Sequence, residues 1–307
     1  MASPIPRVAV AIITGGTRPG PLRDLLLSLG QQEGRGTEFE LGVVVVDNAS
    51  KAMVEDFSSI LEGIEVRTVR ESTPGIPFAR NKSVQEAQEW GADVIAFVDD
   101  DERASSAWVS NALRAMNEHK ADAVAGSVTY RFARDIPAWQ RLGGFYDEPN
   151  YTSGAILPFA RTTNLFVKSL AISQVGHPVF DEKLQFTGGS DVDFTTRLVA
   201  TGARLVWSTE AGTEEDVPFE RCEASWVLRR SLRVGNNIGR RAAKQRGLRG
   251  VLTCLAMGLP RVGVGSVKTL LGFCTGRAAW AGQGIRTAIR GVGMLSAPML
   301  SYEEYKR

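Results

Sequence analysis

The sequence is poor in the residues that build disulfide frameworks and zinc sites. It has three cysteines, Cys222, Cys254 and Cys274, and only two histidines among 307 residues. No two cysteines follow the Cys-x-x-Cys spacing of structural zinc sites. An odd and sparse set of cysteines also argues against a disulfide-stabilised secreted domain. We therefore expect a fold that depends on a hydrophobic core, in a reducing compartment.

Long apolar runs are missing as well. The longest uncharged segments of the C-terminal part are residues 250–260 and 291–302, whereas a membrane-spanning helix needs about 20 apolar residues. The apolar stretch at residues 8–13 is shorter than the core of a secretory signal and is better explained as a first β-strand. We expect neither a signal peptide nor a spanning helix.

Acidic residues are absent from residues 224–302. This stretch holds 13 Lys and Arg and no Asp or Glu, whereas residues 1–223 hold 21 basic and 32 acidic residues. Ordinary surfaces mix both signs, so the asymmetry indicates a negatively charged partner. Nucleic acid is not expected, because no recognition motif or interleaving of aromatic and basic residues is present. A solvated helical surface is the default alternative.

We favour the surface of an anionic membrane as this partner. Each basic residue near an anionic leaflet contributes about 1 kcal/mol, and the apolar segments 251–258 and 270–273 suit shallow insertion. The protein is then expected in the cytoplasm, peripheral on the inner face of the plasma membrane.

The first half of the chain alternates strand and helix patterns, which predicts an α/β fold with a mostly parallel sheet flanked by helices. We expect strands at residues 7–14, 41–46, 65–70, 93–98, 123–130, 164–167 and 204–206. We expect helices at residues 21–31, 52–59, 77–90, 106–119, 168–173 and 194–201. The change in charge predicts a domain at residues 1–223, divided near residue 130, and a basic helical tail at residues 224–307.

Four acidic residues, Asp99, Asp100, Asp101 and Glu102, follow the apolar run 94–98 directly. Open α/β sheets bind ligands at the carboxyl ends of their strands, and clustered carboxylates repel one another unless a cation neutralises them. Mg²⁺ or Mn²⁺ suits oxygen ligands and phosphates. The tetrapeptide therefore predicts a metal–diphosphate site, with an acidic strand-to-helix loop as the alternative.

Two further strand or helix ends carry polar residues. Asp47 and Asn48 follow the strand 41–46, where a carboxylate can accept from a base or a ribose, or can cap the next helix. Arg80 lies in the first turn of a helix after the rigid turn 74–77, and its guanidinium can pair with a phosphate. A surface arginine is the alternative, although the helix dipole disfavours one there.

Residues 188–194 place Asp191 and Asp193 behind Gly188 and Gly189. A carboxylate there can act as a general base towards an attacking hydroxyl, and the glycines would let substrate approach the backbone. Capping of the following helix is the alternative for at least one of the acids.

In chain order these motifs resemble those of the family 2 inverting glycosyltransferases of GT-A fold, over roughly residues 7–240. The matching segments are Thr14 with 17–19, 46–50 ("VDNxS"), 75–81 ("GxxxARN"), 97–102 (Asp-X-Asp) and 188–194 ("GGEDxDF"). The sequence departs from the last motif at Ser190, where the family usually has Glu, and this puts in doubt whatever that Glu would orient. The "QxxRW" element of processive synthases is not recognisable, so single-sugar transfer is favoured over polymerisation.

The resemblance implies a nucleotide-sugar donor, with a UDP-hexose such as UDP-glucose the first guess, bound within residues 1–130. Asp101, with Asp99, would hold Mn²⁺ or Mg²⁺, and Asp191 would be the catalytic base. The other donor-binding residues would be Thr14, Arg18, Asp47, Asn48, Arg80, Asp99, Asp100, Gly188 and Gly189.

The acceptor side would lie within residues 131–223, with Trp139, Asn164 and Asp193 as weaker candidates. Packing of its own loop is an equal explanation for Trp139. The chain end resembles those of bacterial exopolysaccharide glycosyltransferases of the succinoglycan type, which implies a polyprenyl-diphosphate-linked saccharide acceptor. A metal-dependent nucleotidyltransferase and a non-catalytic membrane- or sugar-binding module stay open as alternatives.

Overall fold

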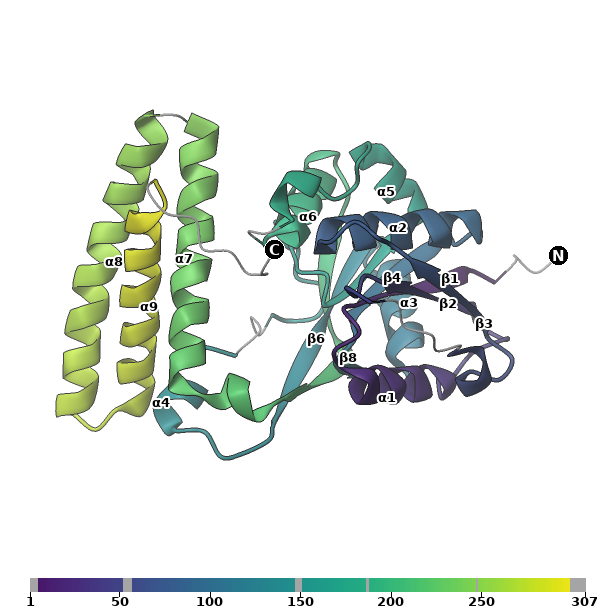
Figure 1. The fold of residues 1–307 in the computed structure, drawn as a ribbon, viewed down its shortest axis with the longest axis horizontal. Helices are drawn as coiled ribbons and strands as arrows, with labels where there is room; N and C mark the ends of the chain where they lie inside the picture. Colours follow the sequence, from purple (N-terminus) through teal and green to yellow (C-terminus); the bar gives the residue numbers. More distant parts are fainter. Residues whose placement is uncertain (1–4, 52–56, 147–150, 186–187, 247, 299–307) are drawn as a thin grey trace. The chain divides into compact units, whose positions relative to one another are not determined.

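A computed structural model of the chain describes residues 5–51, 57–146, 151–185, 188–246 and 248–298. It divides into two compact units (Figure 1). The β/α unit comprises Met1–Thr129 and Asn150–Glu215, and the helical unit comprises Tyr130–Pro149 and Asp216–Lys306. Each unit is described separately below.

An eight-stranded sheet has the order β3-β2-β1-β4-β7-β6-β8-β5. The first four strands in this order, β3, β2, β1 and β4, are parallel to one another. Strand β7 is antiparallel to both β4 and β6, and β5 is antiparallel to β8. The strands are β1 (Arg7–Thr14), β2 (Glu40–Asp47), β3 (Glu65–Arg70), β4 (Val94–Asp99), β5 (Glu102–Ala104), β6 (Ala123–Phe132), β7 (Asn164–Lys168) and β8 (Leu205–Val217).

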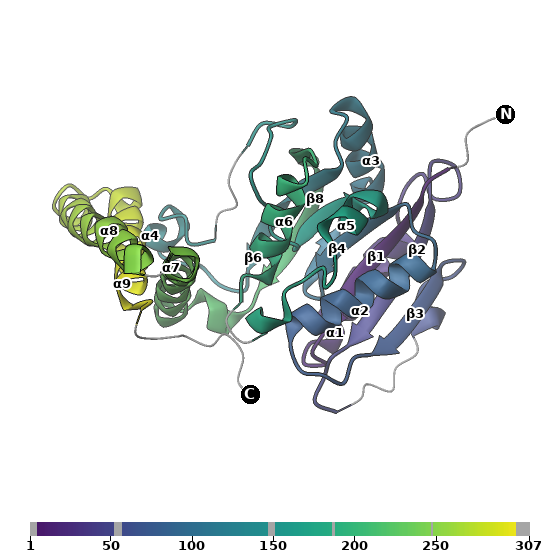
Figure 2. The same ribbon diagram turned by 90° about the horizontal axis from the view of Figure 1, so that it is seen from above.

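Alternation along the strands builds two separate cores in the β/α unit. Val8, Val10 and Ile12 of β1 face one core, and Ala9 and Ala11 face the other, as the two-residue period of a strand requires. The first core packs under α1 (Pro19–Gly30) and α3 (Trp108–Glu118), and the second under α2 (Ile76–Glu89), α5 (Ser169–Val175) and α6 (Ser190–Ala200) (Figure 2). Covering both faces explains why the strand sequences are almost continuously apolar.

Most of the predicted elements of the first half are confirmed, but the region around β8 is not. The strand expected at residues 204–206 is the 13-residue β8, and the short β5 that pairs with it begins at the last residue of the acidic motif. The outer half of β8 is rich in Glu and Thr, so it lacks the apolar run that marks a buried strand. The helix expected at 52–59 falls mostly outside the described residues, apart from a short 3₁₀ turn at Phe57–Ile60.

The helical unit contains α4 (Ala138–Arg141), α7 (Ala224–Arg246), α8 (Leu248–Cys274) and α9 (Ala278–Ser296). Glycines at seven-residue intervals, Gly258, Gly265 and Gly272, form the side of α8 that meets α9. A Cβ atom at Gly265 would lie 2.5 Å from the backbone nitrogen of Ala288. Small residues at such positions let two helix backbones approach closely, as in membrane helix pairs.

One helix contradicts the expectation that no segment is long and apolar enough to span a membrane. Residues Arg249–Cys274 of α8 satisfy that requirement by length and composition alone. The expectation relied on uninterrupted uncharged runs, which end at Arg261 and Lys268. The helix continues through both residues.

Candidate active site

The carboxyl ends of β1, β2 and β4 bring three predicted site residues to one edge of the sheet. The parallel register pairs Thr14 of β1 with Asp47 of β2, and Ile13 of β1 with Asp99 of β4. Ligands of open α/β sheets bind at this edge. The acidic motif 99–102 therefore lies beside the end of β1, with the end of β2 next along the same edge.

Asp100 and Asp101 both hold the guanidinium of Arg18. Its Nη1 atom lies 3.3 Å from Oδ1 of Asp100 and also pairs with Oδ2 of Asp101. The Thr14 hydroxyl donates to the second oxygen of Asp100 at 2.7 Å. The Asp100 and Asp101 side chains are nearly buried, so their oxygens converge on a single positive charge in a site with little water.

Asp99 faces a different cation. Its Oδ1 lies 3.8 Å from Nη2 of Arg80, and Arg80 is buried, with its Nη1 donating to the Ser190 hydroxyl at 3.5 Å. Burial is the main cause of a rise in the pKa of Asp99 to about 6; Arg80 opposes this rise, and the neighbouring carboxylates Asp101, Asp100 and Asp191 add to it. Asp99 thus links the strand end to the start of α6.

Asp191 lies in the first turn of α6. The helix begins at Ser190 and its N-cap is Gly189, so Asp191 is inside the helix and does not cap it. Gly188 and Gly189 precede the helix with φ angles of 69° and 88°, a left-handed conformation that favours glycine. The half-buried Asp191 side chain is close enough to Asp99 to affect its pKa. Asp193, by contrast, accepts from Nε of Arg197 at 2.9 Å along the same helix.

Asp47 and Asn48 are both engaged by the chain itself. The Asp47 side chain is almost fully buried and accepts from Arg70 at 2.6 Å and from the backbone of Ala49 at 2.8 Å. Asn48 donates to the carbonyls of Glu71 and Thr73 and accepts from the backbone of Gly75. Asn48 therefore holds the β3–α2 loop in place, and its contact with a nucleotide stays a prediction.

Arg70 was missed from the sequence. It ends β3, and the parallel register places it opposite Asp47. The sequence did contain a signal, because Arg70 is a basic residue at the last position of the predicted strand 65–70. That signal could be interpreted only once the order β3-β2-β1 placed this strand next to the strand of Asp47.

The structure buries Asn164 within the sheet, where an acceptor does not reach it, and places Trp139 in the helical unit, where its contact with an acceptor stays a prediction. Asn164 is 2% exposed; its amide donates to the carbonyls of Ser127 and Ala211, and its oxygen accepts from Trp108 at 2.9 Å. Trp139 lies in the helical unit and packs edge-to-face against Phe145 at 5.5 Å between ring centroids. Asn164 ties β7 to its neighbours, and Trp139 packs its own loop.

Glu102 is a second residue whose position the sequence did not reveal. It begins β5 and is 1% exposed. Burial raises its pKa well above the ordinary value, Asp99 adds to the rise, and the Thr213 hydroxyl opposes it. Glu102 is thus the most deeply buried carboxylate of the acidic motif.

Among the described residues, no group of three or more His, Cys, Asp or Glu side chains is arranged to hold a metal ion. Such a group is not needed for Mg²⁺ at a phosphate site, which takes one or two carboxylates together with substrate phosphates. Asp100 and Asp101 fit that role, because their oxygens already meet around the Arg18 guanidinium. The carboxylate pair that faces a common cation thus differs from the predicted pair, Asp99 and Asp101.

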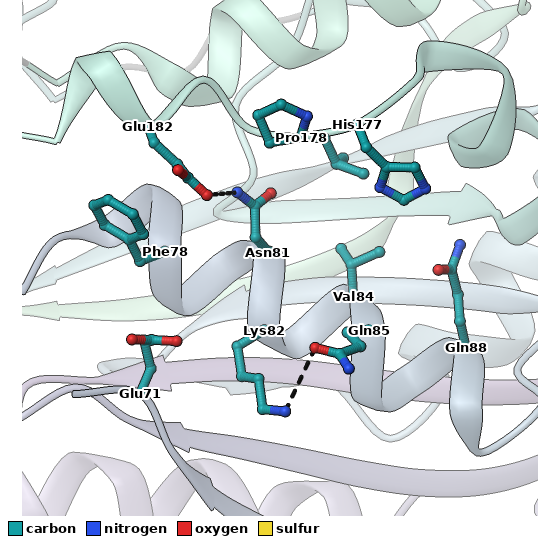
Figure 3. Close-up of a pocket in the computed structure, with 11 residues that line it drawn as sticks. Glu71, Phe78, Asn81, Lys82, Val84, Gln85, Gln88, His177, Pro178 and Glu182 are labelled. Atoms are coloured by element: carbon teal, nitrogen blue, oxygen red, sulfur yellow. Dashed lines mark hydrogen bonds between the residues drawn. The ribbon is translucent and has the colours of Figure 1, made fainter. Parts of the chain in front are cut away.

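A cavity of about 590 Å³ lies on the outer side of α2. It is lined by Phe78, Lys82 and Gln88 of that helix and by the segment around His177 (Figure 3). Asn81 closes one side by donating to Glu182 at 3.1 Å. None of the predicted site residues lines this cavity, which therefore lies apart from the polar strand edge.

The mixed sheet, its helical layers and the acidic motif at the end of β4 define the GT-A class of fold. The comparisons with known proteins agree. The profile of "Glycosyl transferase family 2" matches residues 11–174, and that of "Glycosyl transferase family group 2" matches residues 94–290. The chain belongs to glycosyl transferase family 2.

Two characterised relatives were found. The chain is 32% identical to the "Succinoglycan biosynthesis protein ExoM" of Rhizobium meliloti (strain 1021) over 215 residues, 68% of each chain. It is 27% identical to "Glycosyltransferase AglE" of Haloferax volcanii over 198 residues, 63% of this chain and 61% of that protein.

The fold is shared with solved structures at lower identity. The crystal structure of S. aureus TarS 1-349 has a TM-score of 0.53 at 16% identity and covers 92% of this chain and 91% of its own. GalNAc-T7, solved with UDP, GalNAc and Mn²⁺, has a TM-score of 0.55 at 13% identity and covers 69% of this chain and 44% of its own.

Proposed function

We propose that the protein is a metal-dependent inverting glycosyltransferase that moves one sugar from a nucleotide-sugar, a UDP-hexose such as UDP-glucose, to a hydroxyl of a lipid-linked saccharide. The observation that carries this proposal is the edge where Thr14, Asp47 and the 99–101 carboxylates meet Arg80, Ser190 and the first turn of α6. Solved structures of the same fold with UDP and UDP-GlcNAc support the donor class.

Arg80 is the residue best placed to meet the diphosphate of the donor. Its guanidinium is buried, and its closest acidic neighbour, Asp99, stays 3.8 Å away. The Ser190 hydroxyl offers it a neutral contact at 3.5 Å. A buried cation with distant partners gains strongly from a phosphate that pairs with it bidentately. Asp101 would hold Mn²⁺ or Mg²⁺, which would neutralise negative charge on the leaving nucleoside diphosphate.

Asp191 is proposed as the general base. It would take the proton from the acceptor hydroxyl while that oxygen attacks the anomeric carbon and the bond to the diphosphate breaks. Attack on the face opposite the leaving group inverts the anomeric configuration in one displacement, as in inverting glycoside hydrolysis with a sugar hydroxyl in place of water. Gly188 and Gly189 leave room beside this carboxylate because they have no side chains.

The acceptor is proposed to be a polyprenyl-diphosphate-linked saccharide in the synthesis of a bacterial exopolysaccharide. The name of the Rhizobium relative supports the pathway class, and the 13 basic residues of the acid-free stretch 224–302 suit both a lipid diphosphate and an anionic membrane. The protein would then work in the cytoplasm, bound peripherally to the inner face of the plasma membrane.

Calorimetric titration of the purified protein with UDP, GDP and dTDP, in Mn²⁺ and in EDTA, tests the proposal. We expect one nucleotide to bind, with affinity that depends on Mn²⁺ and falls in Asp101→Ala. Asp24→Ala is the matched control, since Asp24 lies in the same unit but pairs with Arg103, which is not among the proposed donor-binding residues. If none of the three nucleotides binds, or if a nucleotide binds equally in EDTA, the proposal in this form is wrong.

A further inference from the structure

The outward side of α8 is apolar and uncharged along nearly its whole length. Eight large apolar side chains of this helix are between 41% and 65% exposed. Six of them are at least 58% exposed: Leu252, Leu259, Val264, Val267, Leu270 and Phe273. Contiguous exposed apolar surface beyond about 300–600 Å² is unusual for a soluble monomer and marks an interaction site.

Two of the three charged residues within α8, Arg261 and Lys268, lie on the other side of the helix, and the third, Arg249, is exposed at its N-terminal end. Arg261 is half-buried and donates to the carbonyl of Met257 at 2.9 Å, and Lys268 donates to Gln283 of α9 at 2.7 Å. The side opposite the strip carries Gly258, Gly265 and Gly272, which contact α9. The helix therefore packs on α9 through its glycine side, and its leucine side stays exposed among the residues that the structure describes. Figure 1 shows α8 and α9 side by side.

We infer that this strip is the membrane-binding surface of the protein, and that α8 lies in the plane of an anionic bilayer without crossing it. The inference rests on the membrane association within the proposed function and names the element responsible. Charge distinguishes a membrane from a second copy of this chain as the partner of the strip. A second copy would bring another stretch of 13 basic residues and no acids against the first, and such like-charge contacts are unfavourable. An anionic lipid surface complements both the strip and the charge.

The packing of α9 argues against spanning. A helix that crosses the bilayer would draw its partner with it, and α9 carries Gln283, Arg286 and Arg290. Moving an arginine or lysine to the bilayer centre costs about 2.5–3.5 kcal/mol even on insertion scales. An in-plane α8 instead immerses only its leucine side, about 5–10 Å deep, and leaves α9 on the aqueous side.

Vesicle binding of the full-length protein tests this inference. The variant Leu259→Ser/Val267→Ser/Leu270→Ser should bind vesicles of equal parts phosphatidylcholine and phosphatidylglycerol at least about tenfold more weakly than the natural protein. Leu170→Ser is the matched control, because Leu170 is 74% exposed in the β/α unit. UDP binding of the triple variant should be unchanged, which separates a failure of this inference from a failure of the catalytic proposal.

The orientation of α8 has its own readout. Cys274 is an exposed thiol at the end of α8, whereas Cys222 and Cys254 are buried, so a nitrobenzoxadiazole label can be directed to it. External dithionite should quench the label completely in vesicle-bound protein if α8 lies in the plane. Protection of the label would mean spanning, and undiminished vesicle binding by the triple variant, or a dimer in solution that this variant dissociates, would overturn the inference.

A second inference concerns Arg18 and is independent of α8. Its guanidinium pairs with Asp100 and Asp101, the carboxylates that a metal–diphosphate site would use. The Arg18 side chain is 38% exposed while those of its partners are nearly buried. A divalent cation that takes Oδ2 of Asp101 would displace the guanidinium, because both would use that oxygen.

We infer that Arg18 is a positioning residue that holds the two carboxylates in place before the metal arrives and then pairs with the donor phosphate. The inference rests on the proposed donor site. A displaced Arg18 is a long, exposed side chain next to that site, and arginine pairs bidentately with phosphate. Metal and nucleotide would therefore bind cooperatively, since each favours the displaced position of the same side chain.

Binding of Mn²⁺ to the nucleotide-free protein, followed by electron paramagnetic resonance, tests this role. Arg18→Met should raise Mn²⁺ affinity about threefold to tenfold, because it removes a competing, partly exposed ion pair, and should weaken UDP binding in Mn²⁺. Arg103→Met is the control, since it removes a similar charge that pairs with Asp24. Equal or weaker Mn²⁺ binding by Arg18→Met, with UDP binding of the natural protein intact, would overturn this inference alone.

Discussion

The two units of this chain differ in the interactions that hold their elements together. The β/α unit alternates apolar residues along its strands and gathers acids and arginines into bonded sets at the ends of β1, β2 and β4. The helical unit has no acid between residues 224 and 302 and brings α8 and α9 together on glycines. Paired charges order the first unit, and close backbone contact orders the second.

This difference corresponds to two tasks, recognition of a substrate by the β/α unit and binding to a membrane by the helical unit. A site that must recognise a charged substrate needs carboxylates and guanidiniums fixed by one another, as Arg18 and Asp101 are. A surface that meets a fluid, anionic partner needs no fixed geometry, only charge of one sign and apolar area. Variants that affect one unit while sparing the other test whether the division holds.

Asp191→Asn should have the largest effect. An asparagine of the same size cannot accept the proton, so we expect sugar transfer to fall about 10²–10⁴-fold while UDP binding and vesicle binding stay unchanged. Turnover is measured by release of UDP from the donor in the presence of acceptor. Asp193→Asn should be far milder, because Arg197 already holds Asp193. Near-normal turnover in Asp191→Asn would remove Asp191 from the role of base.

Asn164→Ala should destabilise the β/α unit by about 3 kcal/mol, because the Trp108 indole and two strand carbonyls lose their partner inside the core. Urea unfolding followed by circular dichroism gives the free energy. Asn111→Ala is the control, since its amide bonds to Glu210 at the surface. Unchanged stability together with a raised KM for acceptor would return Asn164 to the acceptor site.

Two glycines of α8 should respond with opposite signs to the same change. Gly265→Ala should cost about 1–3 kcal/mol, because its Cβ would lie 2.5 Å from the α9 backbone. Gly263→Ala should stabilise α8 by about 0.5–1 kcal/mol, because nothing lies within 4 Å and alanine favours the helix. Thermal unfolding of both variants provides the comparison, and equal shifts would show that α8 does not pack on α9 through this side.

Asp99→Asn should have the smallest effect and should depend on pH. The folded pKa of Asp99, about 6, exceeds the ordinary value of 3.8, so the folded state binds more protons and loses stability as pH rises from about 4 to 6. Asparagine removes that penalty, which is fully present above pH 6. Because 36% of the Asp99 side chain remains exposed, solvent screens part of it, and we expect about 1 kcal/mol of stabilisation at pH 7.5.

The matching measurement is urea unfolding at pH 4 and pH 7.5. Asp24→Asn, on an exposed carboxylate, serves as the control. A variant that is no more stable at pH 7.5 than the natural protein would contradict the raised pKa of Asp99.

Much of the β/α unit could be predicted from the sequence because its strands are buried on both faces and appear as nearly unbroken Val and Ile runs. The acidic motif could be predicted because its four acids are adjacent in the chain. Asn164 was misjudged for the opposite reason: its partners Trp108, Ser127 and Ala211 are far apart in the chain. β8 was underestimated because pairing with β5, and not hydrophobicity, extends it.

The helical unit shows a different limit. Counting uncharged runs divided α8 at Arg261 and Lys268, but both side chains are accommodated on the side away from the apolar strip. Which side of a helix is covered depends on its neighbours, and a single sequence does not give them. The boundary near residue 223, inferred from the change in charge, is still a prediction.

The register that sets Asp47 opposite Arg70 also restricts how this chain can change in length. Side chains alternate along a strand, so inserting or deleting one residue inside β2 or β3 would turn one partner to the opposite face of the sheet. The buried Asp47 would then lack its guanidinium. Length variation among descendants of this chain is therefore expected in the β2–β3 connection and not within either strand.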